Sequence, residues 1–146
     1  MRWFSGPFGA AFPMIDYHLD LTRSIVVTRA AGKITAGELT AYLVRLMRDP
    51  QFQADLNALI LVHDVNTVPN KLEAGLIAPL IRAWSKRRSG VRWAFVLPNQ
   101  ATRDFVESLL MDARLNAVVT RCFLAESAAL AWLEAAQPVG TAKTAR

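Results

Sequence analysis

Short apolar runs alternate with longer amphipathic stretches along this 146-residue chain, and this alternation constrains its fold more than any other feature. The runs have the length and the β-branched content of strands, and the stretches between them repeat apolar residues at the spacing of helices. Because strands that alternate with helices form right-handed crossovers, the order β-β-α-β-α-β-α-β-α predicts one α/β domain with a mainly parallel five-stranded sheet and four helices. The expected strands are 14–21, 25–32, 56–62, 91–98 and 116–124, and the expected helices are 35–49, 72–87, 99–113 and 126–136.

The beginning of this pattern predicts an antiparallel hairpin at one edge of the sheet. Residues 14–21 alternate apolar and polar side chains, which is typical of a strand with one solvated face. A short turn, 22–24, separates them from the β-branched strand 25–32. The hairpin therefore adds one antiparallel strand to an otherwise parallel sheet.

The two ends of the chain differ from this pattern. Residues 1–13 hold aromatic side chains among Gly and Pro without a helical or strand period, which indicates an arm. Either the arm packs on the body or on a second subunit, or the gene model is too long and translation begins at Met14. The domain is expected to span residues 14–136, and residues 137–146 are expected to form a flexible tail.

Two of the expected helices carry local signals. Thr35 is followed three residues later by Glu38, and this pair predicts a capping box at the start of a helix. Pro79 interrupts the helical pattern of residues 72–87. Either that helix bends at Pro79, or a short turn precedes a helix that has Pro79 in its first turn.

Composition excludes several classes of protein. The chain is 53% hydrophobic and 20% charged, as globular proteins are, and no apolar run approaches the roughly 18 residues that a membrane helix needs. Cys122 is the single cysteine, so an intrachain disulfide is excluded and a cytoplasmic location is expected. His18 and His63 lie far apart and no glycine-rich phosphate-binding motif occurs, so we expect no metal site and no cofactor.

The net charge of +5 has a local origin. Segment 82–92 holds five basic and no acidic residues, and the remaining 12 basic residues balance the 12 acidic ones. Cations at a helix end complement the helix dipole, so a solvated helix end accounts for the segment; the alternative is a surface for phosphate, nucleic acid or an acidic protein. We favour the helix end because the cluster is short and no nucleic-acid-binding motif accompanies it. The residues of this candidate basic patch are Arg82, Lys86, Arg87, Arg88 and Arg92.

Two loops, 63–71 and 98–103, are expected where parallel α/β sheets place their sites, at the carboxyl ends of the strands. His63 and Asp64 could form a general base with its orienting carboxylate. However, adjacent residues of an extended chain point to opposite faces, and no Ser or Cys nucleophile lies near. We therefore interpret the pair as the polar end of a strand, with Asp64 or Asn66 capping a turn, and predict no catalytic residue. The candidates for binding a partner or ligand are His63, Asp64, Asn66, Thr67, Asn70, Lys71, Asn99 and Arg103.

Three stretches, taken with the order of the elements, resemble the SpoIIAA-like proteins, whose fold is shared with the STAS domain of bacterial anti-sigma factor antagonists. They are AAGKIT at 30–35, LILVHDV at 59–65 and ALAWLEA at 129–135. The resemblance covers roughly residues 14–136 and implies a non-enzymatic bacterial domain that binds a protein or a small ligand and is often dimeric. Its closer branch consists largely of proteins of unknown function.

The resemblance also implies where a regulatory site would lie. In the antagonists, a D-S-S-G-type motif places a phosphorylated serine at the start of the helix after the strand. Here VPNK, residues 68–71, occupies the comparable place, so Asn70 or Lys71 replaces the serine, and Thr67 lies a few residues early. A phosphoryl switch adds about two negative charges at a helix N-terminus. Without a hydroxyl at that place, the chain is expected to lack the switch.

We therefore expect a non-enzymatic STAS-like interaction module that binds a regulatory protein or a second copy of itself through residues 63–71 and the helix after them. A domain that binds an apolar or anionic small molecule in the crevice between 63–71 and 98–103 is the alternative. Nucleic-acid binding through 82–92 is a weaker alternative, and no membrane insertion is expected. The walls and the polar end of the crevice would be formed by Leu72, Leu76, Phe105, Asn99 and Arg103.

Overall fold

The predicted order of strands and helices is confirmed in a computed structural model that describes residues 14–52, 55–86, 90–115 and 118–136. The predicted arm, residues 1–13, and the predicted tail, 137–146, lie outside the described residues. The strands are β1 (Ile15–Asp20), β2 (Ile25–Lys33), β3 (Asn57–Thr67), β4 (Arg92–Val96) and β5 (Val119–Phe123). The helices are α1 (Ala36–Arg48), α2 (Lys71–Ser85), α3 (Gln100–Ala113) and α4 (Glu126–Ala136).

The strands form one sheet in the order β1-β2-β3-β4-β5. β1 pairs with β2 antiparallel, with Tyr17 opposite Thr28, and the other neighbouring strands pair parallel. The hairpin therefore lies at the sheet edge, as the sequence predicts. The α/β class with a mainly parallel sheet is also confirmed.

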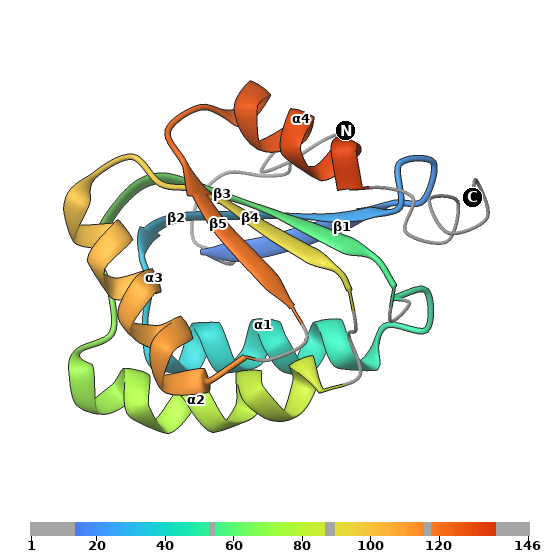
Figure 1. Ribbon diagram of the computed structural model, residues 1–146. Coiled ribbons are helices and arrows are strands. Elements are labelled where there is room, and N and C mark those ends of the chain that lie inside the picture. The colour runs from blue at the N-terminus through green and yellow to red at the C-terminus, as the bar shows by residue number, and fades with distance from the viewer. Residues whose placement is uncertain (1–13, 53–54, 87–89, 116–117, 137–146) are drawn as a thin grey trace, which may run out of the picture.

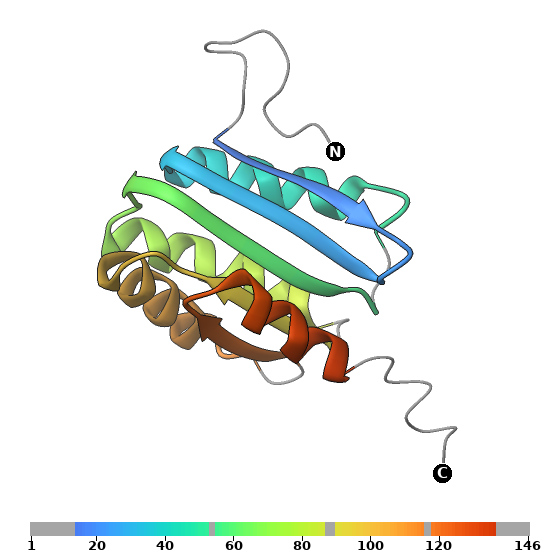
Figure 2. The same ribbon diagram turned by 90° about the horizontal axis from the view of Figure 1, so that it is seen from above.

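The strand order determines which face each helix covers. Each crossover from β2 to β5 steps to the next strand in the same direction, so right-handed connections place α1, α2 and α3 on one face. Figure 1 shows these three helices on one side of the sheet and α4 on the other. α4 packs against β3, β4 and β5, and Figure 2 shows β1 and β2 lying beside it rather than beneath it.

Strand alternation divides the core into two parts. On β2, Val26 joins the cluster on the α1–α3 side of the sheet, and its neighbour Val27 joins the cluster on the α4 side. On β3, Ala58 and Leu59 divide in the same way. A central strand covered on both faces needs apolar residues at consecutive positions, which explains the continuous apolar run in its sequence.

β3 is longer than the sequence predicts. The expected strand ended at residue 62, but β3 continues to Thr67, so the interpretation of His63-Asp64 as the strand end is wrong. A bulge lets the strand continue: His63 pairs with Ala31, and the next paired residue is Val65, opposite Gly32. Asp64 is the extra residue and adopts a left-handed backbone with φ of 48°.

α2 also differs from its prediction. It is one helix from Lys71 to Ser85 with Pro79 inside it, so the alternative with a separate turn before Pro79 is wrong. Pro79 lies on the exposed side, where water can satisfy the carbonyl group that its missing N–H leaves unpaired. Leu72 and Leu76, predicted as walls of the crevice, are instead 77% and 75% exposed. The side chains of α2 that are buried are Ala74, Ile77, Ala78, Ile81 and Ser85.

Hydrogen bonds at the helix starts explain where these elements begin. The predicted capping box of Thr35 and Glu38 is present at α1. A second box starts α2, where Asn70 Oδ1 accepts from the Glu73 N–H at 2.8 Å and Glu73 Oε1 accepts from the Asn70 N–H at 2.9 Å. Asn99 caps α3 by accepting from the N–H of Thr102 at 2.9 Å. These caps place the first turns of α2 and α3 beside the carboxyl ends of β3 and β4.

Candidate functional site

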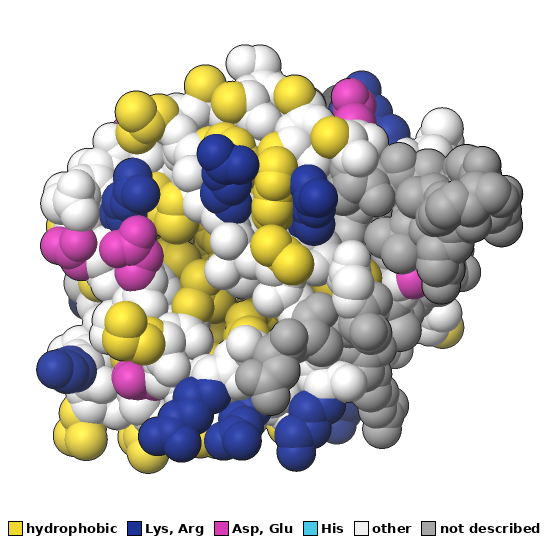
Figure 3. All heavy atoms as spheres, in the orientation of Figure 1, with side chains coloured by type: hydrophobic (Ala, Val, Ile, Leu, Met, Phe, Trp, Pro, Cys, Tyr) yellow, Lys and Arg dark blue, Asp and Glu magenta, His cyan; other side chains and the backbone are white. Residues whose placement is uncertain are grey.

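An apolar cavity of about 140 Å³ lies between the sheet and the layer formed by α1, α2 and α3. Its wall combines side chains from β1, β2, β3 and β4 with side chains from all three helices. Figure 3 shows hydrophobic side chains gathered in a hollow between the sheet and these helices, with Lys and Arg side chains around it. The cavity differs from the predicted crevice, because it extends beneath the helix layer rather than across the strand ends.

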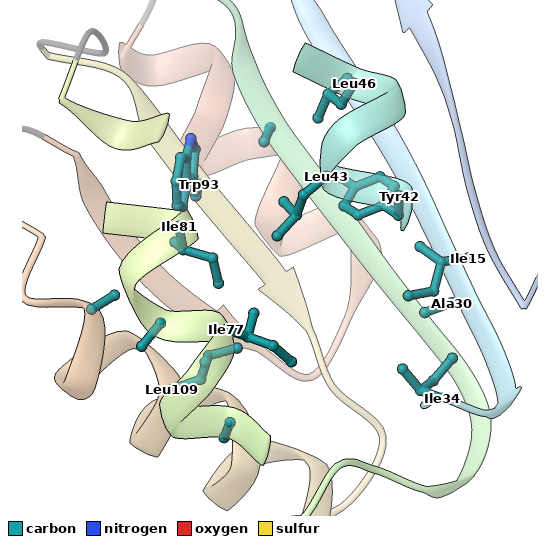
Figure 4. Packing of buried hydrophobic residues seen from close by; sticks show 14 of the residues in the cluster. Ile15, Ala30, Ile34, Tyr42, Leu43, Leu46, Ile77, Ile81, Trp93 and Leu109 are labelled. Atoms are coloured by element: carbon teal, nitrogen blue, oxygen red, sulfur yellow. The ribbon is translucent and has the colours of Figure 1, made fainter. Parts of the chain in front are cut away.

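Two groups of side chains face the cavity from opposite sides. Figure 4 shows Tyr42 of α1 beside β2, Leu43 of α1 over β3, and Ile81 of α2 near Trp93 of β4. Phe105 of α3 also lines the cavity, as the sequence predicts for a crevice wall. The exposed Leu72 and Leu76 do not contribute to the described wall.

Stacked aromatic rings support the α2 side of the cavity. The rings of Trp84 and Trp93 stack with centroids 5.2 Å apart, and Phe52 stacks on Trp84 at 5.5 Å. Both tryptophans line the cavity. Large rigid rings between α2 and β4 hold the helix away from the sheet, because their width sets the distance between the two elements.

The wall includes a pair of buried hydroxyl groups. Thr28 of β2 is 2% exposed and Tyr42 of α1 is 7% exposed, and their oxygen atoms lie 2.6 Å apart. Burial raises the pKa of Tyr42 to about 12, so its phenol remains protonated at neutral pH. Thr102 also lines the cavity, but its hydroxyl donates to the Asn99 carbonyl oxygen at 3.0 Å.

The bulge in β3 keeps charge out of the cavity. Val62 faces the cavity, and simple alternation would turn Asp64 toward it as well. Because Asp64 is the extra residue of the bulge, the next inward side chain is instead Val65, and Asp64 is exposed. The bulge thus preserves an apolar wall where the sequence turns polar.

The first group of predicted binding residues lies along the end of β3. His63 lies two residues after Leu61, so both side chains point to the same face of β3, the α4 face, and His63 points away from the cavity. The Nε2 atom of His63 lies 3.2 Å from Nη1 of Arg29. The structure shows no hydrogen bond between His63 and Asp64 among its described contacts. Thr67 is exposed, and its carbonyl oxygen accepts from the N–H of Ile34. The side chain of Asn66 lies outside the described set.

The second group lies at the starts of α2 and α3. Asn70 and Asn99 act as helix caps, so the side-chain oxygen of each already accepts a backbone N–H. Lys71 is exposed at the first turn of α2. Arg103 donates through Nε to Glu107 at 3.0 Å. The structure therefore brings these residues to the same end of the sheet as predicted, with most of their side chains held by local contacts; their binding roles stay predictions.

The described part of the basic patch is divided between two faces. Arg82 and Lys86 are exposed at the end of α2. Arg92 instead lies under α4, donating to the Trp132 carbonyl oxygen at 3.0 Å with its guanidinium 4.7 Å from the ring centre. Arg87 and Arg88 lie outside the described residues. Because Arg92 points to the opposite face, it does not extend the surface formed by Arg82 and Lys86.

The polar chemistry of the described chain is limited. Within residues 14–136, less the gaps, no three His, Cys, Asp or Glu side chains gather closely enough to hold a metal ion. Burial raises the pKa of the Cys122 thiol, which makes its reactive thiolate scarcer at neutral pH. None of the described helices is long and apolar enough to cross a membrane. What the site offers is an apolar hollow between the sheet and α1–α3.

Sequence reasoning missed the cavity and its hydroxyl pair. Thr28 occupies an inward position of a strand, and Tyr42 occupies the apolar face of a helix, so both read as ordinary core positions. The sequence did contain one indication of the pair, because the Thr28 hydroxyl at an inward strand position needs a hydrogen-bond partner. The partner on α1 could not be named without knowing how that helix lies on the sheet.

No protein-family model and no curated protein matches the sequence. Among solved structures, the chain is similar to an uncharacterised protein of the DUF3478 family with a SpoIIAA-like fold from Shewanella loihica PV-4. The TM-score is 0.54, the identity is 15%, and the alignment covers 87% of this chain and 99% of that one. A likeness at this identity concerns the fold, and on that basis the chain has the SpoIIAA-like fold that its sequence predicts.

Proposed function

We propose that this protein reversibly binds a small apolar molecule in the cavity beneath α1, α2 and α3, without catalysing a reaction. The observation that supports the proposal is the cavity of about 140 Å³ with an almost wholly apolar wall. An engineered apolar cavity of about 150 Å³ in another protein binds benzene. The volume here suits one aromatic ring or a short branched hydrocarbon.

The energetics favour an occupant. A ligand that buries roughly 200 Å² of apolar surface gains about 5 kcal/mol at about 25 cal/mol per Å². This corresponds to a dissociation constant of about 0.1–1 mM. Binding of this strength is measurable by calorimetry or chemical-shift titration.

Calorimetric titration of the full chain with toluene tests the proposal. We expect saturable binding in the range of about 0.1–1 mM, with a negative heat-capacity change from apolar burial. Ala58→Leu should abolish binding, because Ala58 lines the cavity and three added carbon atoms would occupy it. Leu76→Gln is the matched control: it lies on the exposed side of α2 and should leave binding unchanged. No saturable binding to the wild-type chain would refute the proposal.

A second candidate function is self-association through α2. Leu72 and Leu76 are 77% and 75% exposed and lie four residues apart on one helix face. Exposed apolar side chains gathered on one face mark interaction surfaces. This supports the homodimer that the sequence analysis proposed, with α2 as its contact. Light scattering should show a dimer that the double variant Leu72→Gln/Leu76→Gln converts to a monomer; a wild-type monomer at high concentration would contradict it.

A further inference from the structure

The hydroxyl pair in the cavity wall holds one more proton than its own hydrogen bond uses. Thr28 and Tyr42 each carry one O–H donor, and a single hydrogen bond of 2.6 Å joins them. Whichever hydroxyl donates, the hydrogen atom of the other remains. The structure gives neither hydroxyl a second hydrogen-bond partner among the described residues. By contrast, the Thr102 hydroxyl in the same wall donates its proton to the carbonyl oxygen of Asn99.

This spare donor is buried against the cavity. Thr28 and Tyr42 are both more than nine-tenths buried, and both line the cavity. A buried donor without an acceptor is unfavourable, because folding has removed the water that would otherwise accept from it. Water is a poor occupant of the cavity, since a buried water typically makes about three hydrogen bonds and the wall here is otherwise almost wholly apolar.

We propose that the ligand is an apolar molecule carrying a single hydrogen-bond acceptor, such as a small ketone, ester or ether, whose oxygen accepts the spare proton of the Thr28–Tyr42 pair. This inference rests on the proposed function and makes it more specific. The carbon body fills the apolar volume, and the acceptor meets the one polar point of the wall with an unused donor. A carboxylate is a poor acceptor group here, because its charge would be buried at the Thr28–Tyr42 pair without a cation: the described residues of the lining include no Lys or Arg.

Two probes of the same shape isolate the acceptor. Acetophenone carries a carbonyl oxygen, and α-methylstyrene carries a CH₂ group in its place. Titrations of the full chain, followed by backbone amide chemical shifts, give a dissociation constant for each. A net neutral hydrogen bond makes acetophenone about three- to tenfold tighter than α-methylstyrene for the wild-type chain.

Three variants test which groups supply the donor. Thr28→Val leaves the Tyr42 hydroxyl free to donate, and Tyr42→Phe leaves the Thr28 hydroxyl free, so each single variant should keep the preference for acetophenone. The double variant Thr28→Val/Tyr42→Phe removes both donors and should bind the two probes equally. Replacing both partners by apolar groups of similar shape is close to neutral for stability, and amide spectra of each unliganded variant verify its fold.

The outcomes separate this inference from the proposed function. Equal binding of both probes to the wild-type chain would refute the acceptor while leaving the apolar cavity as a binding site. A double variant that retains the full preference would show that another group meets the oxygen, and would also overturn the inference. Failure of both probes to bind would overturn the proposed function together with it.

Discussion

The two faces of the sheet are covered by helices in different ways. On one face, Ala129 of α4 and Ala94 of β4 are both 0% exposed and belong to the same buried cluster. On the other face, α2 and α3 meet the sheet through wide side chains, among them Trp84 and Phe105. The distance between packed elements depends on the side chains at their contact. Small residues therefore let α4 lie close, and large ones hold α1–α3 away and leave the cavity.

A single strand contributes side chains to both faces of the sheet. The neighbouring residues Val26 and Val27 of β2 belong to different clusters, one beside the cavity and one on the α4 side of the sheet. A shared strand thus joins a filled core, which is suited to stability, to a hollow one, which is suited to binding. The account predicts that the two faces respond differently to the same substitution.

The largest expected effect is truncation of the filled core. Leu133 of α4 is 1% exposed and does not line the cavity, so Leu133→Ala should lower the free energy of unfolding by about 3–5 kcal/mol. Leu43→Ala on the cavity side should cost about 2–3 kcal/mol, because one side of Leu43 already faces empty volume. Urea denaturation of both variants measures the difference. Equal losses of unfolding free energy in the two variants would contradict the proposed difference between the two faces.

Enlarging a small residue should again destabilise the α4 face more than the cavity face. Ala129→Leu should lower the free energy of unfolding by about 1–3 kcal/mol, because α4 lies too close for a larger side chain. Ala58→Leu, on the cavity side of β3, should change it by less than about 1 kcal/mol or raise it, because the new side chain enters the cavity. Thermal unfolding of the two variants measures the contrast. Strong destabilisation by Ala58→Leu would mean that the volume is not free.

A smaller effect is expected where α1 is held to the edge strand. Tyr17 of β1 donates to Asp49 Oδ2 at 2.7 Å, and this bond lowers the pKa of the Asp49 carboxyl. Tyr17→Phe should cost about 0.5–1 kcal/mol, a value reduced by solvent screening near the surface.

The pH dependence of that effect follows from the lowered pKa. A carboxyl with a lowered folded-state pKa stabilises the fold above its unfolded pKa, and the stabilisation disappears as pH falls through the folded value. The difference between the wild-type chain and Tyr17→Phe should therefore be full at neutral pH and decline in acid. Denaturant titrations from neutral to acidic pH measure it, and a difference that grows in acid would contradict the assigned bond.

The smallest effect is expected on the outside of α2. Leu76 is 75% exposed, so Leu76→Gln should change the free energy of unfolding by less than about 0.5 kcal/mol. The same variant should bind toluene as the wild-type chain does. Loss of toluene binding in this variant would show that the exposed face and the cavity are coupled.

The sequence predicted the fold because the fold follows from local periodicity. The period of two in 14–21 and the helical spacing in 35–49 gave the element types, and the handedness of crossovers gave the layers. The bulge at Asp64 escaped prediction because it depends on pairing with Gly32 of β2, which lies about 30 residues away in sequence.

The candidate site was harder to predict than the fold. Leu72 and Leu76 were wrongly predicted as crevice walls, because they fit the helical spacing as well as the buried Ile77 and Ile81 do. Which of them faces inward depends on how α2 packs against α3 and the sheet. A cavity is in addition a property of distances between elements, and a single sequence does not specify them.

Methyl chemical shifts during a benzene titration of the full chain test the central claim most directly. Neighbouring residues of β2 and β3 report on opposite faces, so each strand contains its own control. The account predicts ring-current shifts that saturate for the methyl groups of Val26, Ala58 and Ile60, which line the cavity, and none for Val27, Leu59 and Leu61, which face α4. Shifts on both faces alike, or on neither, would contradict a cavity confined to the face beneath α1–α3.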